Sequence, residues 1–235
     1  MTRPRGHPVR AAARFLASVM MVSGALLIAD AATTLLWQEP VSWVVAQRQQ
    51  AQLEEALANP STRVLARKPL PGDAIARISI PAIDVDEYVV EGTDTANLRK
   101  GPGHYPSTPL PGDGETTAIA GHRTTYGAPF RRIDDLDRGD RIVVEMPRRS
   151  YAYRVERVKI VEPTDLSVLR RVGHERLVLS ACHPLYSAAQ RVIVFARVVP
   201  GTAADAPSSS EESRDSKKRI NATTRPSEIR TTASQ

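Results

Sequence analysis

The sequence is poor in cysteine and in aromatic residues. One of its 235 residues is cysteine, and phenylalanine, tryptophan and tyrosine together make up 5%. A single cysteine excludes an internal disulfide and any paired CxxC motif. Hydrophobic residues (41%) and charged residues (25%) follow ordinary globular usage, and the length allows one domain with appendages.

Patterns that bind metals or phosphates are also lacking. The sequence has no HExxH motif and no glycine-rich phosphate loop, and the adjacent Cys182 and His183 do not have ligand spacing. A cluster of acids lacks the EF-hand pattern, and we expect its members to cap turns in a solvated loop: Asp134, Asp135, Asp137 and Asp140. We therefore expect no metal and no cofactor.

Most of the excess positive charge lies at one end of the chain. Of the net charge of +6, residues 1–14 contribute four arginines and no acid. Residues 200–235 hold six basic and five acidic residues, and residues 15–199 hold 22 basic and 21 acidic residues. A basic head of this kind is a topology signal rather than a footprint for DNA, so we expect no nucleic-acid partner.

The arginines precede an apolar run from Phe15 to Trp37 whose one charge is Asp30. As a helix, this run would rise about 34 Å, enough to cross a hydrocarbon core of about 30 Å. The positive-inside rule places residues 1–14 in the cytoplasm as a basic head and the later residues outside. Ala29-Asp30-Ala31 also resembles a signal-peptidase site. Because the apolar pattern resumes at Leu35, we favour an uncleaved, single-pass transmembrane signal anchor over 15–37; both alternatives export the rest of the chain.

Three segments follow the predicted anchor. Residues 38–73 are predicted to form a stalk, with a helix over 41–58 and an extended, proline-containing stretch over 61–73. Residues 74–199 form the predicted domain. Residues 200–235 hold too few large apolar residues to order themselves, so they are predicted to be a disordered C-terminal tail.

The predicted domain is all-β. Alternating and short apolar runs, separated by Gly, Pro and Asp turns, predict strands over residues 74–80, 85–90, 116–120, 141–146, 151–161, 176–181 and 192–199. Short helical pieces are predicted over 95–100, 129–136 and 164–169. This pattern favours an antiparallel sheet closed into a barrel of seven or eight strands and disfavours βαβ units.

Cys182 ends one of the apolar strands, and the following His183-Pro184 forces the chain out of the ladder. A residue at that point is presented at the rim of a barrel. A free cysteine is most often a small buried core residue, but an idle thiol is a liability in an exported protein. We therefore interpret Cys182 as a nucleophile that needs a partner to accept its proton.

His122 is the candidate partner, because it follows another short apolar strand and Gly121 permits close backbone approach. The alternative is an ordinary turn histidine. His104 and His174 lie in turn-like segments and are expected to be solvated. His183 is expected to face away from the thiol, because neighbours on a strand point to opposite faces.

Arg191 opens the last predicted strand, across a short loop from Cys182. If the two flanking strands are adjacent, its guanidinium lies beside the thiol and could hold an oxyanion or a substrate carbonyl. A surface ion pair is an equally good interpretation of this arginine.

Three segments together resemble sortases: TAIAGHRTTYGAPFRRIDDLDRGDR (117–141), LVLSACHPLYSAAQRVIVFARVV (177–199) and the upstream GPGHYPSTPLPGDGETT (101–117). HRTTYGAPF, and Cys-His-Pro followed by Ser-Ala and Arg, are most similar to class E, the actinobacterial housekeeping-type sortases. The resemblance covers about residues 74–199. One departure is Ser180-Ala181, where the family commonly has Thr-Thr or Thr-x; Ser180 keeps a hydroxyl and Ala181 loses one.

The resemblance implies a closed eight-stranded sortase β-barrel and transpeptidation of cell-wall sorting signals. Cys182 would attack the Thr–Gly carbonyl of an LPxTG-like signal, with LAxTG implied by the class E similarity. His122 would protonate the leaving amine and deprotonate the incoming one, and Arg191 would stabilise the oxyanion or order the signal. Substrate contacts are implied for three further residues: Tyr126, for which packing is the alternative, Ser180 and Ala181.

The implied partners are surface proteins with C-terminal sorting signals, the amine of a lipid-linked peptidoglycan precursor, and the membrane. Two other functions fit the same residues: a membrane-anchored cysteine peptidase that gives the acyl group to water, and a non-catalytic wall-binding module. A pilus-polymerising relative is disfavoured, because no Asp-Pro-aromatic lid segment precedes the domain.

Overall fold

The computed structural model describes residues 8–36, 40–201 and 204–205. The basic head up to residue 7, Trp37, and the predicted tail apart from residues 200, 201, 204 and 205 lie outside these ranges.

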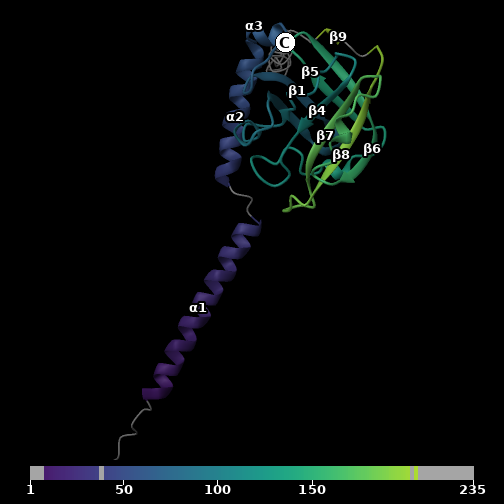
Figure 1. Ribbon diagram of the computed structural model, residues 1–235. Coiled ribbons are helices and arrows are strands. Elements are labelled where there is room, and N and C mark those ends of the chain that lie inside the picture. The colour runs from purple at the N-terminus through teal and green to yellow at the C-terminus, as the bar shows by residue number, and fades with distance from the viewer. Residues whose placement is uncertain (1–7, 37–39, 202–203, 206–235) are drawn as a thin grey trace, which may run out of the picture.

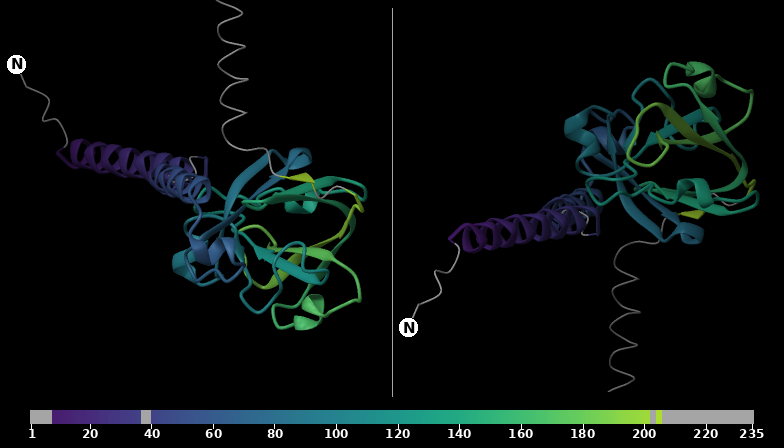
Figure 2. Two further views of the ribbon diagram at one scale, coloured as in Figure 1. Left: turned by 90° about the horizontal axis from the view of Figure 1, so that it is seen from above. Right: turned by 90° about the horizontal axis from the view of Figure 1, so that it is seen from below.

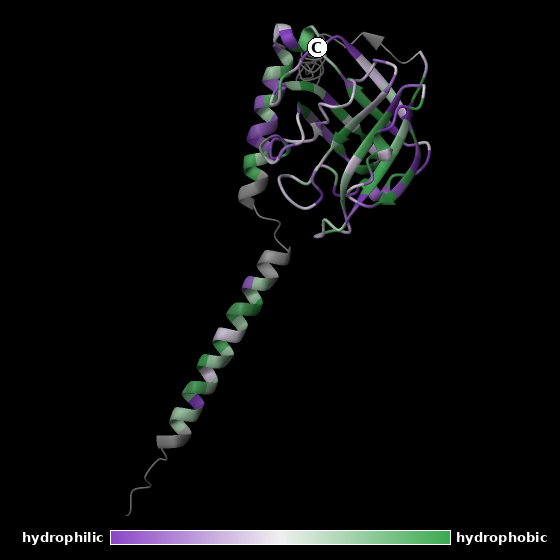
Figure 3. Ribbon diagram, viewed as in Figure 1, coloured by the Kyte–Doolittle hydropathy of each residue, from purple (hydrophilic) through white to green (hydrophobic). Residues whose placement is uncertain are grey.

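Helix α1 (Pro8–Leu36) contains most of the predicted anchor. Its Ala11–Ala31 window has a mean hydropathy of 1.9, is long enough to cross a membrane, and is not buried inside the structure. Figure 1 shows α1 as a rod apart from the strands, and most of its coloured ribbon in Figure 3 has the colours of hydrophobic residues. A signal sequence near an N-terminus passes the same test of length and composition, so the helix is compatible with both alternatives for this segment.

Eight strands close into a barrel in the order β5-β1-β2-β3-β4-β7-β8-β6, and β6 pairs back with β5 (Figures 1 and 2). A ninth short strand, β9, adds to the side of β6. The closed eight-stranded fold predicted from the sequence is therefore confirmed. The strands are β1 (Ala74–Ile80), β2 (Val85–Glu91), β3 (Gly103–His104), β4 (Thr116–Ala120), β5 (Arg141–Glu145), β6 (Arg149–Val161), β7 (Arg176–His183), β8 (Gln190–Val198) and β9 (Ala204–Asp205).

Two strand pairs correct the expectation of an antiparallel sheet, because β2–β3 and β4–β7 run parallel. After β4 the chain first makes the β5–β6 hairpin and then returns as β7, so the connection is a crossover and not a tight turn. Parallel pairing brings the carboxyl ends of β4 and β7 to the same edge of the barrel.

The barrel interior holds the main apolar core. Successive side chains of each wall strand point alternately into this core and to the outer face. On β7, Leu177, Leu179 and Ala181 belong to the main core, whereas Val178 belongs to a second cluster that also includes Ala118 of β4. Side chains of a strand alternate between the two faces of a sheet. Residues of even number on β7, which include Cys182, therefore share the outer face of the wall.

Helix α2 (Pro40–Ala58) forms within the predicted stalk and lies along β1 and β2 (Figure 1). Leu53 is buried against Val90, and the Gln50 side chain donates to the Tyr88 carbonyl (3.1 Å) and accepts from its N–H (2.6 Å). These contacts tie the helix to an edge of the barrel wall, so this part of the predicted stalk packs with the domain.

The remaining helical pieces are short. The stretch expected to be extended over 61–73 contains α3 (Thr62–Leu65), which Ser61 caps by accepting from the Val64 N–H. The predicted helix over 129–136 is only the 3₁₀ turn η2 (Ile133–Asp135), because its neighbouring residues form loop contacts around Phe130. The others are η1 (Pro81–Ile83), α4 (Thr95–Leu98) and η3 (Leu166–Leu169).

Candidate active site

The ends of three neighbouring strands carry the predicted catalytic residues. In the parallel β4–β7 pair, Ala120 lies opposite Ser180, and the Gly121 N–H donates to the Ser180 carbonyl at 3.0 Å. Paired residues on β4 and β7 differ by 60 in residue number. Continued past the end of β4, this register places His122 level with Cys182. A strand pairing that the sequence left undecided thus brings the imidazole and the thiol to one edge.

Arg191 lies directly opposite Cys182 in the antiparallel β7–β8 pair. Directly opposed residues have side chains on the same face, with Cβ atoms about 4.5–5.5 Å apart. The adjacency on which the interpretation of Arg191 depended is therefore present. His122, Cys182 and Arg191 therefore lie at the same end of the wall formed by β4, β7 and β8, with Cys182 and Arg191 on its outer face.

Phe130 holds the backbone of His122 in place. The Phe130 N–H donates to the His122 carbonyl at 2.9 Å, and the Phe130 ring is completely buried against Gly121. A Cβ at Gly121 would lie 2.5 to 2.9 Å from three ring atoms, which is closer than ordinary van der Waals contact. The close approach predicted at this glycine is an approach of an aromatic ring.

The environment of His122 favours its neutral form. The side chain is half-buried, and its Nε2 is shielded from solvent with no hydrogen-bond partner among the described residues. Burial lowers the pKa of His122, and the positive charge of Arg99 lowers it further. Neutral imidazole can accept a proton, as a general base must.

Tyr126 lies against the same histidine. Its ring centroid is 5.2 Å from that of His122 with the planes tilted by 49°, and the Arg99 guanidinium carbon lies 5.4 Å from the Tyr126 centroid. An arginine at this distance from an aromatic ring makes a cation–π contact. Tyr126 thus connects an exposed cation to the imidazole, and its predicted contact with substrate stays a prediction.

Arg191 is held by the backbone that directly precedes it. Its Nη1 donates to the carbonyls of Ala188 and Gln190, both at 2.9 Å. Within the part of the chain that the structure describes, no carboxylate forms an ion pair with this guanidinium. The surface ion pair considered for Arg191 is therefore not seen there, and its charge is available to an anion.

Ser180 and Ala181 are both buried, with 6% and 3% of their surface exposed. Ala181 packs in the barrel core, and Ser180 shares the outer face with the thiol. A contact of either residue with substrate stays a prediction.

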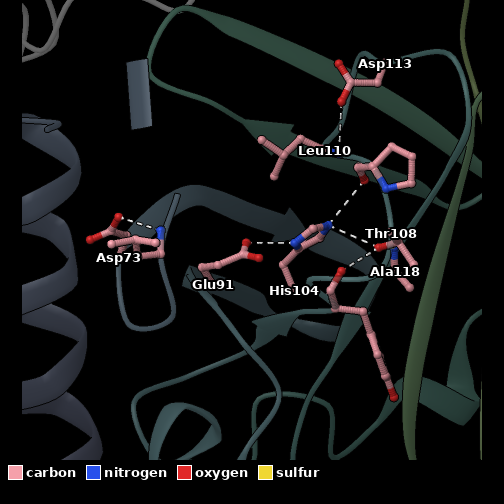
Figure 4. Close-up of polar contacts among 10 residues, drawn as sticks. Asp73, Glu91, His104, Thr108, Leu110, Asp113 and Ala118 are labelled. Atoms are coloured by element: carbon pink, nitrogen blue, oxygen red, sulfur yellow. Dashed lines mark hydrogen bonds and ion pairs between the residues drawn. The ribbon is translucent and has the colours of Figure 1, made fainter. Parts of the chain in front are cut away.

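His104 corrects the expectation of a solvated turn histidine. It is 2% exposed, its Nδ1 lies 2.8 Å from the carboxylate of buried Glu91, and its Nε2 lies 3.2 Å from the Thr108 hydroxyl (Figure 4). The same hydroxyl accepts from the Ala118 N–H at 3.1 Å. This network joins β2, β3 and β4, and it was missed because the turn-like sequence conceals the two-residue strand β3. His174 is also half-buried, with its Nε2 shielded from solvent.

Sequence reasoning also missed Arg123, which is 3% exposed beside the site. It forms an ion pair with Asp134, so this acid does not merely cap a turn, whereas Asp140 does accept from the Asp137 N–H at 2.8 Å. An arginine three residues after an apolar strand and eleven residues before a cluster of acids was the signal that could have indicated the pair.

Comparison with known proteins places this arrangement in a family. Residues 78–199 match the Sortase domain. The chain is 33% identical to sortase D of Bacillus subtilis over 137 residues, covering 56% of this chain and 67% of that protein. It is 28% identical to sortase SrtE1 of Streptomyces coelicolor over 209 residues, covering 80% of this chain and 57% of that protein.

A solved structure of a Clostridium perfringens sortase D5 transpeptidase superposes with a TM-score of 0.58 at 26% identity, covering 66% of this chain and 99% of that one. The similarity to SrtE1 supports the class E resemblance. The matched region contains β4, β7 and β8 with the residues at their ends. The chain therefore belongs to the sortase family of cysteine transpeptidases, which attach proteins to the cell wall.

Proposed function

We propose that Cys182 is the nucleophile of this transpeptidase, with His122 as its general acid–base and Arg191 as its oxyanion donor. One observation carries the proposal: the parallel β4–β7 register and the antiparallel β7–β8 register bring all three residues to one edge. In the first step His122 takes the proton of the Cys182 thiol, and Sγ bonds to the Thr carbonyl carbon of an LPxTG-like signal. The Thr–Gly bond then breaks, and the leaving amine takes a proton from His122.

Release of the product follows the reverse order. The amine of a cell-wall precursor attacks the thioester carbon, His122 takes the proton of that amine, and the thiolate of Cys182 leaves. Each tetrahedral intermediate carries a negative oxygen, which a fixed guanidinium stabilises. Arg191 suits this role because the carbonyls of Ala188 and Gln190 hold it opposite Cys182, and it lacks a carboxylate partner in the described ranges.

Substrate and topology are proposed from the family. The class E similarity supports LAxTG as the sorting signal, and the position of Tyr126 beside His122 supports a role in reading it. We further propose that α1 spans the cell membrane once, with the arginine-rich head in the cytoplasm and the barrel outside.

The test uses the full chain in detergent micelles with a library of LxxTG peptides. Mass spectrometry is expected to find a thioester on Cys182, preferentially with Ala at the second peptide position, and none on Cys182→Ala. Adding an amine is expected to give the transfer product. Hydrolysis alone, whatever amine is supplied, would show a peptidase instead, and absence of any thioester would refute a catalytic function for Cys182.

A further inference from the structure

Arg123 is a buried cation that joins the loop after β4 to the end of β7 beside the site. Its Nε and Nη2 donate to the Arg131 carbonyl at 3.2 and 3.1 Å, and its Nη2 also pairs with the Asp134 carboxylate. Its Nη1 donates to the Cys182 carbonyl at 3.4 Å and to Nδ1 of His183 at 3.3 Å. One side chain therefore contacts both the loop that follows β4 and the end of β7.

The contact with the Cys182 carbonyl replaces a bond of the sheet. The β4–β7 ladder reaches the bond from the Gly121 N–H to the Ser180 carbonyl. One step further, a parallel ladder would bring the N–H of residue 123 to the Cys182 carbonyl, and then the N–H of residue 184 to β4. Residue 184 is a proline, which has no N–H. The ladder ends here, and the side chain of Arg123 donates to the carbonyl instead.

Because Arg123 is buried, its hydrogen bonds depend on acceptors in fixed positions. The Arg123 side chain is 2% exposed, whereas the Asp134 carboxylate that pairs with it is 39% exposed. A buried guanidinium must satisfy its donors with acceptors in fixed positions, because it has lost its contacts with water. Arg123 does so by spanning the gap between two chain segments. Lysine cannot reproduce this, since its ammonium is a point charge without the planar fork of five donors.

We infer that Arg123 is a positioning residue that sets the spacing between His122 and Cys182, an inference that rests on the proposed function. Arg123 is bonded to the neighbours of both groups, through the loop that Phe130 anchors on one side and the Cys182 carbonyl on the other. Because the two strands are no longer linked by backbone bonds at this level, the guanidinium supplies the link that keeps the imidazole level with the thiol.

The first test compares Arg123→Met and Arg123→Lys with Arg132→Met. Arg132 is on the same loop, but its side chain is 53% exposed and pairs only with surface carboxylates. At a temperature where all variants are folded by circular dichroism, the rate of thioester formation at saturating peptide is expected to fall about ten- to a hundredfold in both Arg123 variants. KM should change less than threefold, and Arg132→Met should match the wild type. A folded Arg123→Met variant with an unchanged rate, or with only KM raised, would overturn the inference.

A second test asks whether Arg123 acts through His122. In a His122→Ala background, Arg123→Met should cause no further loss, because there is no imidazole left to position. The same double-mutant cycle of His122→Ala and Arg123→Met can be measured without a sorting peptide. The measured quantity is then the rate at which iodoacetamide alkylates Cys182 as a function of pH. The effect of His122→Ala on the alkylation profile should be lost in Arg123→Met; full retention of that effect refutes positioning. A wild-type protein that alkylates but accepts no peptide refutes the proposed function alone.

Discussion

Substitution of Gly121 by alanine tests the packing that holds His122. The added Cβ would lie 2.5, 2.8 and 2.9 Å from three atoms of the Phe130 ring, whereas ordinary contact begins near 3.4 Å. Phe130 is completely buried and cannot move into solvent. Either the ring or the end of β4 must therefore shift by roughly 1 Å, a displacement comparable to those that matter in active sites.

Two quantities follow from this overlap. Overpacking a core position costs typically about 1–3 kcal/mol. For a domain of this size, each kcal/mol corresponds to roughly 3–5 °C in melting temperature. Because His122 is the next residue and its carbonyl is bonded to the Phe130 N–H, the shift also displaces the imidazole. We expect the rate of thioester formation to fall about ten- to a hundredfold.

The assay pairs calorimetry with single-turnover acylation, and it includes Phe130→Leu as a partner substitution. Leucine removes the ring atoms that the new methyl group would meet, so Gly121→Ala should cost less in the Phe130→Leu background than in the wild type. Additive losses in the double variant would refute the ring contact as the cause. A Gly121→Ala protein with the wild-type melting temperature and rate would refute the whole chain of reasoning.

Four further predictions concern charge, topology and the packed helix. Arg99→Ala should raise the pKa of His122, because it removes a nearby positive charge. The NMR titration of the imidazole and the limb of the pH–rate profile that reports His122 should both move to higher pH. No movement would exclude Arg99 as a cause of the lowered pKa. Burial raises the pKa of Glu87 to about 7, so the folded state holds a proton that the unfolded chain releases near pH 4.5. The free energy of unfolding should then fall by roughly 1–2 kcal/mol, allowing for solvent screening, as pH rises from 4.5 to 7, and Glu87→Gln should abolish that fall in urea titrations. Cys182 is the sole cysteine, so a membrane-impermeant maleimide should label it in intact cells only if the barrel is outside. Gln50→Ala removes hydrogen bonds to two backbone carbonyls and one N–H, so it should cost about 1.5–4 kcal/mol and raise hydrogen exchange in α2; unchanged exchange would mean that the helix is held by apolar contacts alone.

Local patterns in the sequence were enough to predict most strands. β1 and β4 begin and end where the apolar runs do, and β5, β6, β7 and β8 differ from their predicted ranges by one or two residues at one or both ends. These runs are informative because each wall strand has a buried face, which restricts its residue types. The two-residue strand β3 has no such run, so His104 was read as part of a turn.

The pairing of the strands could not be obtained in the same way. Alternation says which face a residue occupies but not which strand lies beside it, and it suggested antiparallel neighbours throughout. The parallel β4–β7 pair is decided by closure of the barrel around its core after the β5–β6 excursion. Arg123 was missed for the same reason, because its acceptors lie up to 60 residues away in the chain.

The sequence by itself determined the apolar helix, the all-β domain and the three residues proposed to carry the chemistry, because composition, alternation and the family segments are local properties. Only the tertiary structure decided that His122, Cys182 and Arg191 share one edge and that a buried arginine links two of their strands. Those relations depend on the register of strands distant in sequence, and register is settled when the whole barrel closes on one core.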